Sequence, residues 1–281
     1  MKLRGIKRLL SREKYTTPVY DLTNGKEPLD LIYSNFQGGA AWVPMERCRT
    51  HMLGFTKAGN PFVKTLHDYA QGQHSYDGSV LEQYYNSYCP ESMGQVLQSN
   101  SLTLQHYHAM ATVLPWGIST PETKLPRICV DPNAEKLLSK EAHQLGLSEK
   151  DNYGWQFFGP VSHDLGVLEF ERLSSVYESI KDQGYHPERY GFIHGQFLIS
   201  EEDWVWVNIG GKHRFSSLLA LDYEQIPVAL KSRSSALFIR RSDSAHWPNV
   251  KNGLFKEEDA LNIFDRIMNG CSYTSLLAIS N

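Results

Sequence analysis

The clearest run of apolar positions along the chain begins at residue 204. Trp204 to Ile209 are apolar or β-favouring except for Asn208, which predicts a buried strand. Gly210 and Gly211 follow directly, and glycine accepts the positive φ angles and close backbone approach of a tight turn. The sequence therefore predicts a strand that ends in a glycine turn.

The residues after this turn predict a helix and a second strand. Apolar side chains at positions 215, 218 and 219 favour a short helix over residues 214–221. Ile226 to Val228 indicates a strand, and Pro227 within it favours a sheet edge or the beginning of a strand. Residues 204–228 are thus expected to form a strand, a turn, a helix and a strand in succession.

Periodic apolar positions predict further elements on both sides of this region. A helical period, with proline or glycine at its ends, indicates helices over residues 61–70, 79–88, 133–146, 164–184 and 257–268. Short apolar runs indicate strands at residues 192–193, 197–199 and 236–240. Four prolines between residues 114 and 132 favour an extended connection.

These elements predict an α+β protein with two parts. Residues 1–155 form a mixed N-terminal region that would shape a pocket for an acceptor molecule. Residues 156–281 form a C-terminal domain with a small mixed sheet and helices. A chain of 281 residues with 41% hydrophobic and 21% charged residues has the composition of a globular protein large enough for this division.

Composition also limits the cellular compartment and the kinds of partner that we expect. No apolar run is long enough for a transmembrane helix, and the first residues lack the apolar core of a signal peptide. The four cysteines are scattered without a CxxC pair, so reduced cysteines in the cytoplasm are the simplest interpretation. His106 and His108 lack a third ligand at a recognisable spacing, so no protein metal site is predicted. The net charge of −3 gives no support to a nucleic-acid partner.

The basic N-terminus leaves two interpretations open. Residues 1–14 contain six Lys or Arg side chains, with apolar residues at helical spacing between them. An amphipathic helix on an anionic membrane surface has this pattern. A docked or frayed terminal helix with a solvated basic face has it too, and we consider this second interpretation the better one. The sequence does not predict an oligomeric state.

Three basic residues give the glycine turn a candidate chemistry. A helix N-terminus presents main-chain N–H groups and the positive end of the helix dipole, which favours an anion. Lys212, His213 and Arg214 stand at this point, and Arg can hold phosphate oxygens in a bidentate fork. A tight turn with three solvated charges would use the same residues.

A succession of short motifs surrounds this turn. Ser179 to Lys181 lies in a predicted helix that ends at Gly184, Gly211 to Arg214 forms the turn, and Ile226 to Val228 forms the last strand. Over about residues 165–232, this order resembles the ParB/sulfiredoxin superfamily domain, with its Ser-Ile-Lys helix, Gly-x-[His/Arg]-Arg turn and Ile-Pro-Val strand. The tail from Arg240 to the last helix also resembles uncharacterised bacterial proteins of surface-polysaccharide gene clusters.

The resemblance implies a ParB/sulfiredoxin-like fold that binds nucleotide phosphates at the turn. Within the family, chromosome-partitioning proteins bind CTP as a DNA-clamp switch, sulfiredoxins use ATP to activate a sulfinic acid, and some relatives are free-serine kinases. By position, the phosphates of ATP or CTP would be held by Gly210, Gly211, Lys212, His213 and Arg214, with Ser179 and Lys181 nearby.

Departures from the family pattern narrow these activities. Sulfiredoxins need a cysteine in the turn where this chain has Lys212, and a lysine cannot form the thiosulfinate intermediate. The partitioning proteins need a helix-turn-helix domain and a dimerising tail, and the residues after Val228 show no basic recognition helix. A kinase-like activity is therefore the leading expectation.

The sequence thus favours a cytoplasmic, nucleotide-dependent phosphotransferase that uses Mg²⁺ and acts on a small hydroxylated molecule such as a sugar or an amino-acid derivative. A carboxylate would orient or deprotonate the acceptor hydroxyl. Glu171 is the first choice, followed by Glu169 and Glu178. On an ideal helix Glu171 and Glu178 share a face, whereas Glu169 points elsewhere. Glu171 could instead pair with a neighbouring Lys or Arg.

Other interpretations stay open. Arg240 and Arg241 would either clamp a substrate anion or end an edge strand. The protein could be a nucleotide-sensing switch that binds or hydrolyses CTP or ATP without transferring phosphate, or a structural or phage-type protein that keeps only the fold.

Overall fold

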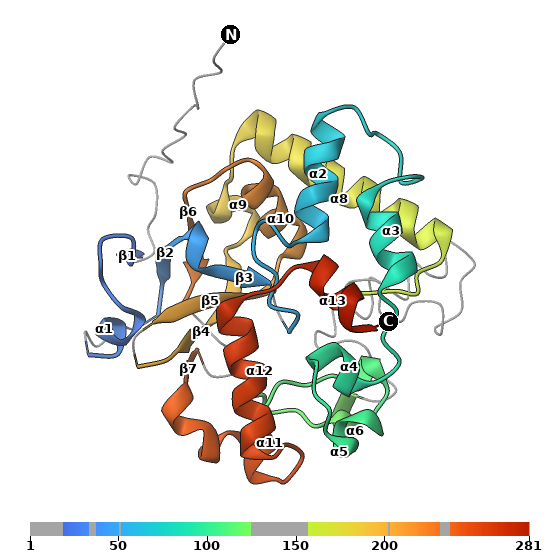
Figure 1. The fold of residues 1–281 in the computed structure, drawn as a ribbon. Coiled ribbons are helices and arrows are strands. Elements are labelled where there is room, and N and C mark those ends of the chain that lie inside the picture. The colour runs from blue at the N-terminus through green and yellow to red at the C-terminus, as the bar shows by residue number, and fades with distance from the viewer. Residues whose placement is uncertain are drawn as a thin grey trace.

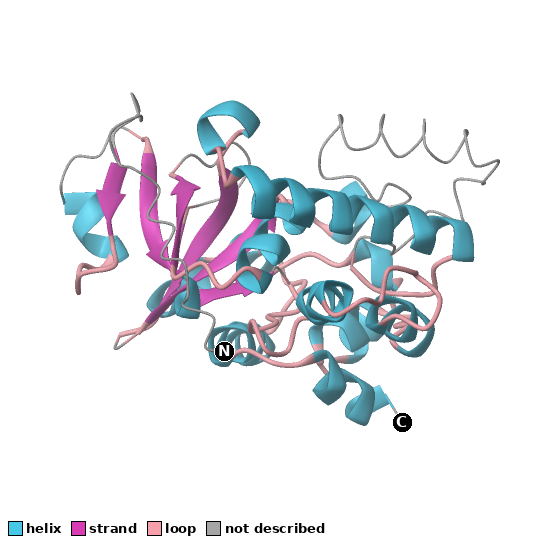
Figure 2. Cartoon of the chain, turned by 90° about the horizontal axis from the view of Figure 1, so that it is seen from above, coloured by secondary structure: helices cyan, strands magenta, loops and turns pink. Residues whose placement is uncertain are grey.

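The computed structural model describes residues 19–33, 38–50, 52–124, 157–201, 203–230 and 237–280. The segments at residues 1–14 and 133–146, predicted to be helical, lie outside these ranges. The strands gather at one end of the molecule and most helices at the other (Figure 2). At this level of detail the predicted mixed sheet with helices is confirmed.

A seven-stranded mixed sheet organises the described part of the chain. Its order is β1-β2-β6-β4-β5-β3, and β7 pairs with β4 beside this path. The strands are β1 (Val19–Asp21), β2 (Ala40–Pro44), β3 (Cys48–Thr50), β4 (Ile193–Ile199), β5 (Trp204–Gly210), β6 (Gln225–Ala229) and β7 (Phe238–Arg240). The sheet thus takes strands from both sides of the predicted boundary at residue 155.

Strand pairing brings the two parts of the chain together. β2 runs antiparallel to β6, and β3 runs parallel to β5. β4 and β5 form an antiparallel pair whose register shifts between His194 and Gly195. A Cβ atom on Gly195 would lie 2.3 Å from the ring of Trp206, so this close approach of two strands needs a glycine.

Three details differ from the prediction. Pro227 is not on an edge strand, because β6 lies between β2 and β4. Pairing of β6 with β4 covers only Val228 and Ala229, so Pro227 lies opposite Trp42 of β2 alone. The strands predicted at 192–193 and 197–199 are one strand, because the polar residues between them stay paired with β5. The proline-rich stretch contains a short helix that begins at Pro121, since proline fits the first turn of a helix.

The helices predicted from periodicity within the described ranges are confirmed. They are α2 (Pro61–Ala70), α3 (Val80–Ser87), α8 (His163–Gln183), α10 (Lys212–Ala220) and α12 (Glu257–Asn269). Shorter helices are α1 (Pro28–Tyr33), α4 (Met93–Leu97), α5 (Leu102–Gln105), α6 (Pro121–Lys124), α9 (Pro187–Tyr190), α11 (Pro248–Lys251) and α13 (Tyr273–Ser280). The 3₁₀ helices are η2 (Met45–Arg47), η3 (Ala109–Ala111) and η5 (Arg241–His246).

Three helices pack together beside the sheet. α10 contacts both α8 and α2, and in Figure 1 these helices lie above the strands, whereas α11 and α12 lie below them. The apolar stripe of α8 is buried in this contact, and Tyr69 of α2 meets the rings of Phe170 and Tyr177 edge-on. The same contact fixes where the polar face of α8 points.

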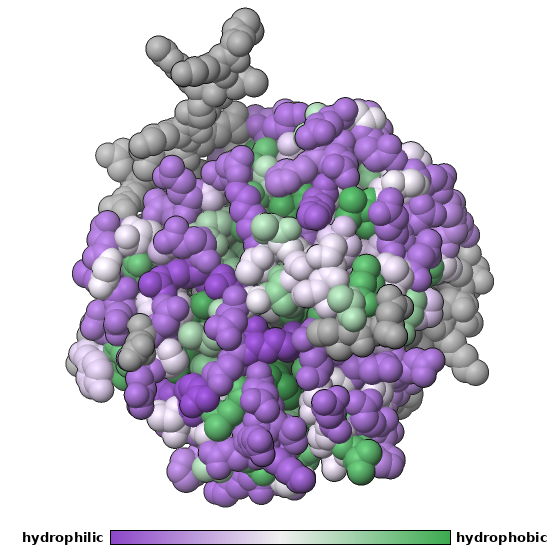
Figure 3. Space-filling model, in the orientation of Figure 1, coloured by the Kyte–Doolittle hydropathy of each residue, from purple (hydrophilic) through white to green (hydrophobic). Residues whose placement is uncertain are grey.

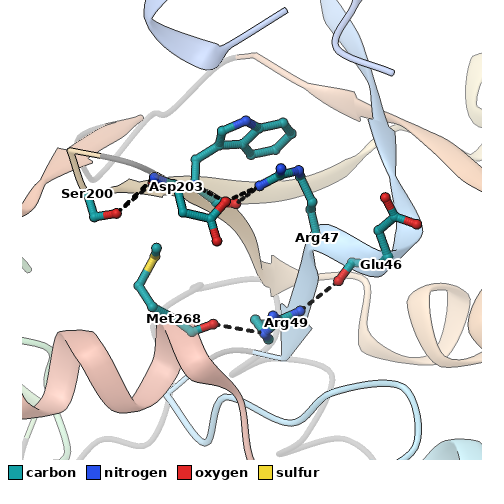
Figure 4. Close-up of polar contacts among 7 residues, drawn as sticks. Glu46, Arg47, Arg49, Ser200, Asp203 and Met268 are labelled. Carbon is teal, nitrogen blue, oxygen red and sulfur yellow. Dashed lines mark hydrogen bonds and ion pairs between the residues drawn. The ribbon is translucent and has the colours of Figure 1, made fainter. Parts of the chain in front are cut away.

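Two arginines, Arg47 of η2 and Arg49 of β3, tie this part of the chain to the C-terminal half. Arg47 pairs with Asp203 and donates to the main-chain oxygen of Trp204 at 2.8 Å (Figure 4). Arg49 donates to the main-chain oxygen of Met268 at 3.3 Å and to that of Glu46 at 2.8 Å. These contacts join η2 to the beginning of β5 and β3 to α12.

The outer face seen in Figure 3 is mostly hydrophilic, with apolar residues in small patches between polar ones. Within the described ranges, no helix combines the length and the apolar character needed to cross a membrane.

Candidate functional site

A cavity of about 930 Å³ lies beside the turn that joins β5 to α10. Its wall is formed by the turn over residues 208–214, one face of α8, the segment 184–190, Phe157, and residues from the N-terminal half. A volume of this size accommodates a nucleotide-sized or drug-sized ligand. The glycine turn predicted from sequence thus borders the cavity directly.

The turn places a left-handed glycine directly before the N-terminus of α10. Gly211 is the residue before α10 and has φ 79° and ψ 38°, the left-handed region that favours glycine. Because Gly211 has no side chain, it offers no capping oxygen to the first turn of α10. Asn208, the polar residue of the buried strand, donates from Nδ2 to the main-chain oxygen of Gly210 at 2.6 Å and so shapes the turn.

A buried carboxylate holds two of the three basic residues. Glu169 of α8 is 0% exposed, and its Oε1 accepts hydrogen bonds from Lys212 Nζ and from His213 Nε2, the latter at 2.8 Å. Burial by itself would raise the pKa of Glu169, but the electrostatic contacts and hydrogen bonds of His213 and Lys212 outweigh burial and lower the pKa from 4.5 to about 2. Glu169 is therefore ionised at neutral pH.

Lys212 lies between this carboxylate and the ring of Phe62. Its Nζ is 4.2 Å from the centre of the Phe62 ring, a cation–π distance. Burial lowers the pKa of Lys212, and the Glu169 carboxylate acts in the opposite direction. Its side chain is 17% exposed and that of His213 is 24% exposed, so both cover Glu169 and reach the cavity wall.

Arg214, also in the first turn of α10, lines the cavity and bonds to the segment around α9. Its Nη1 donates to the main-chain oxygen of Tyr190 at 2.8 Å and to that of Gly191. These bonds attach the segment around α9 to the first turn of α10. Tyr190 and Ile209, both large apolar side chains with high exposure, also line the cavity.

The other predicted residues divide into two groups. Ser179 and Glu171 are exposed on the face of α8 that lines the cavity, together with the turn. Glu178 and Lys181 form an exposed ion pair at 3.3 Å and do not line it. Arg241 makes two 2.8 Å hydrogen bonds to Asp265 of α12, and Arg240 ends β7; neither lines the cavity.

Sequence reasoning missed several lining residues. Arg172 lies next to Glu171 and faces the cavity, and its spacing from Ser179 equals that between Glu171 and Glu178. This spacing places Arg172 and Ser179 on one face of a helix and could have identified Arg172 from the sequence. Four further lining residues come from the N-terminal half: Thr50, Leu53, Phe55 and Phe62. Their local sequence pattern does not indicate that they line a cavity.

No protein-family model, no curated protein and no solved structure matches the chain. Over the described residues, His, Cys, Asp and Glu side chains form no group of three or more that could hold a metal ion.

Proposed function

We propose that the protein is a nucleotide-dependent phosphotransferase with a ParB/sulfiredoxin-like nucleotide-binding domain, acting on a small hydroxylated molecule. One observation carries the proposal: the glycine turn, the basic residues of α10, Ser179 and Glu171 all line the same cavity. These residues come from segments more than twenty positions apart. Phosphoryl transfer needs such positioning and charge neutralisation more than it needs covalent chemistry by the protein.

The phosphates would lie over the first turn of α10. Because Lys212 and His213 are engaged with Glu169, we expect main-chain N–H groups of this turn to take phosphate oxygens, as they do at other helix N-termini. The guanidinium groups of Arg172 and Arg214 line the same cavity and would neutralise the remaining charge. ATP is the expected nucleotide, with CTP as the alternative.

The acceptor would lie between the phosphates and α8. Glu171 is the carboxylate among the described lining residues, and it would orient the acceptor hydroxyl or complete the coordination of Mg²⁺ held mainly by the phosphates. When bound, Mg²⁺ would neutralise charge on the transferred group. The apolar side chains of Leu53, Phe55 and Phe62 would contact the body of the acceptor or the base.

Turnover with purified protein tests the proposal. ATP or CTP with Mg²⁺ should be hydrolysed slowly alone, and faster when a panel of sugars and hydroxyl amino acids is added, with a phosphorylated product visible by mass spectrometry. Saturable nucleotide binding without product in any mixture would refute the phosphotransferase.

The same outcome would support the alternative, a nucleotide-sensing switch. One observation favours this alternative: the side chains of Lys212, His213 and Arg214 all bond to other parts of the protein, so nucleotide binding could release or tighten those bonds. Protease protection of the segment around α9 by nucleotide alone would favour the switch.

A further inference from the structure

We propose that His213 is the general base of the reaction and that Glu169 is the positioning residue that holds it. The inference rests on the proposed phosphotransferase and names a residue for the step that removes the acceptor proton. It differs from the expectation that a carboxylate of α8 performs this step.

The geometry defines which ring nitrogen is available. His213 Nε2 lies 2.8 Å from Glu169 Oε1, and a carboxylate in that position accepts a hydrogen bond from Nε2–H. The remaining ring nitrogen, Nδ1, then carries the lone pair. His213 borders the cavity, and no hydrogen bond of Nδ1 with another described residue occurs.

Lys212 makes this arrangement possible. Its ammonium group pairs with the same Oε1 and supplies a counter-charge for the buried carboxylate. A neutral imidazole oriented by a carboxylate is the arrangement that accepts protons from hydroxyl groups in many enzymes. The set differs from a solvated ion pair because Glu169 is 0% exposed.

The proposed transfer moves one proton and exchanges one phosphorus–oxygen bond for another. The acceptor O–H proton moves to Nδ1 of His213 while the acceptor oxygen forms a bond to the terminal phosphorus of the nucleoside triphosphate. The bond from that phosphorus to the bridging oxygen breaks, and the nucleoside diphosphate leaves with the electron pair. His213 then returns its proton to solvent. Glu169 keeps its charge throughout.

The test compares two histidine variants. His213→Gln keeps an N–H donor near Glu169 but has no base. His163→Gln is the control, because His163 lies outside the cavity, where its Nε2 is 2.7 Å from Asp77 Oδ1. For His213→Gln we expect kcat to fall by about 100-fold or more, the usual contribution of a general base, with nucleotide Kd unchanged within about threefold. His163→Gln should keep kcat. Equal kcat in both variants and the unmodified protein would overturn the proposal.

A second readout does not depend on turnover. Nitrogen-15 NMR of the His213 ring at pH 8.5, assigned by comparison with His213→Gln, should show Nε2 protonated and Nδ1 unprotonated, and Glu169→Gln should change this spectrum. A proton on Nδ1 would overturn the proposal whether or not nucleotide is consumed. If the unmodified protein binds nucleotide but never transfers phosphate, the proposed function fails and the catalytic role of His213 fails with it, whereas the NMR spectrum still decides the geometry.

Discussion

At the scale of single residues, Glu169 determines what the basic turn can do. It lies on α8, far from the turn in sequence, and its buried Oε1 engages Lys212 and His213 together. The sequence places Glu169 on a different face from Glu171, and the structure agrees. Which of the two faces is buried depends on where α10 packs, and a local pattern does not contain that information.

Replacing this carboxylate should reduce stability strongly. Glu169→Gln leaves Lys212 buried without its counter-charge, and breaking a buried pair on one side costs about 3–5 kcal/mol. Urea unfolding followed by tryptophan fluorescence would measure the loss. Glu178→Gln is the matched control, because Glu178 lies on the same helix in an exposed pair and should change stability by less than about 1 kcal/mol. Equal effects of the two substitutions would contradict the assignment.

The stability difference between the unmodified protein and Glu169→Gln should depend on pH in a defined direction. Because the folded pKa of Glu169 is about 2, below its ordinary value of 4.5, its contribution is complete above pH 4.5 and is lost as the pH falls toward 2. The stability gap between the unmodified protein and Glu169→Gln should therefore narrow below pH 4.5. A gap of constant size at pH 3 would show that the carboxylate is not held by these charges.

At the scale of elements, the strand, glycine turn and helix over residues 204–220 could be predicted from sequence. Apolar residues specify β5, two glycines specify the turn, and a short apolar stripe specifies α10. The position of Pro227 inside the sheet could not be predicted, because neighbours in a sheet are set by distant segments. Proline is tolerated there since β4 pairs with β6 only at Val228 and Ala229.

The turn itself can be tested with two glycines of similar conformation. Gly211 has φ 79° and Gly253 has φ 82°, and a Cβ atom at 211 would lie 3.0 Å from Arg214 Nη2, whereas 253 is open. Both alanine variants should lose about 1–2 kcal/mol of stability, the cost of left-handed backbone with a side chain. Only Gly211→Ala should also weaken nucleotide binding, by about tenfold in calorimetry. Equal nucleotide affinity of both variants would remove the turn from the site.

At the scale of the whole molecule, both halves of the chain build the sheet and the cavity. β2 and β3 pair with β6 and β5, and Arg47 and Arg49 add hydrogen bonds across the same contact. Phe55 and Phe62 of the first half line the cavity with the turn of the second half. Sequence patterns report local periods, so they did not reveal that the strands of residues 40–50 belong to the C-terminal sheet.

This arrangement predicts how a fragment behaves. Residues 156–281 expressed alone would expose the sides of β5 and β6 that normally pair with β3 and β2. We expect the fragment to show no cooperative thermal transition by circular dichroism, and the full chain to show one. A fragment that unfolds cooperatively, with tryptophan fluorescence like that of the full chain, would instead support an independent domain that begins at residue 156.

The central claim is that the cavity beside the β5–α10 turn binds a nucleotide through its phosphates, and calorimetric titration with ATP and CTP in the presence of Mg²⁺ tests it most directly. The unmodified protein should bind one of them saturably. Arg214→Ala should weaken binding by about tenfold or more, the value of a charge-assisted hydrogen bond to phosphate, whereas Arg189→Ala, outside the cavity, should not. Absence of saturable binding at millimolar nucleotide, or equal affinities of both arginine variants, would contradict the claim.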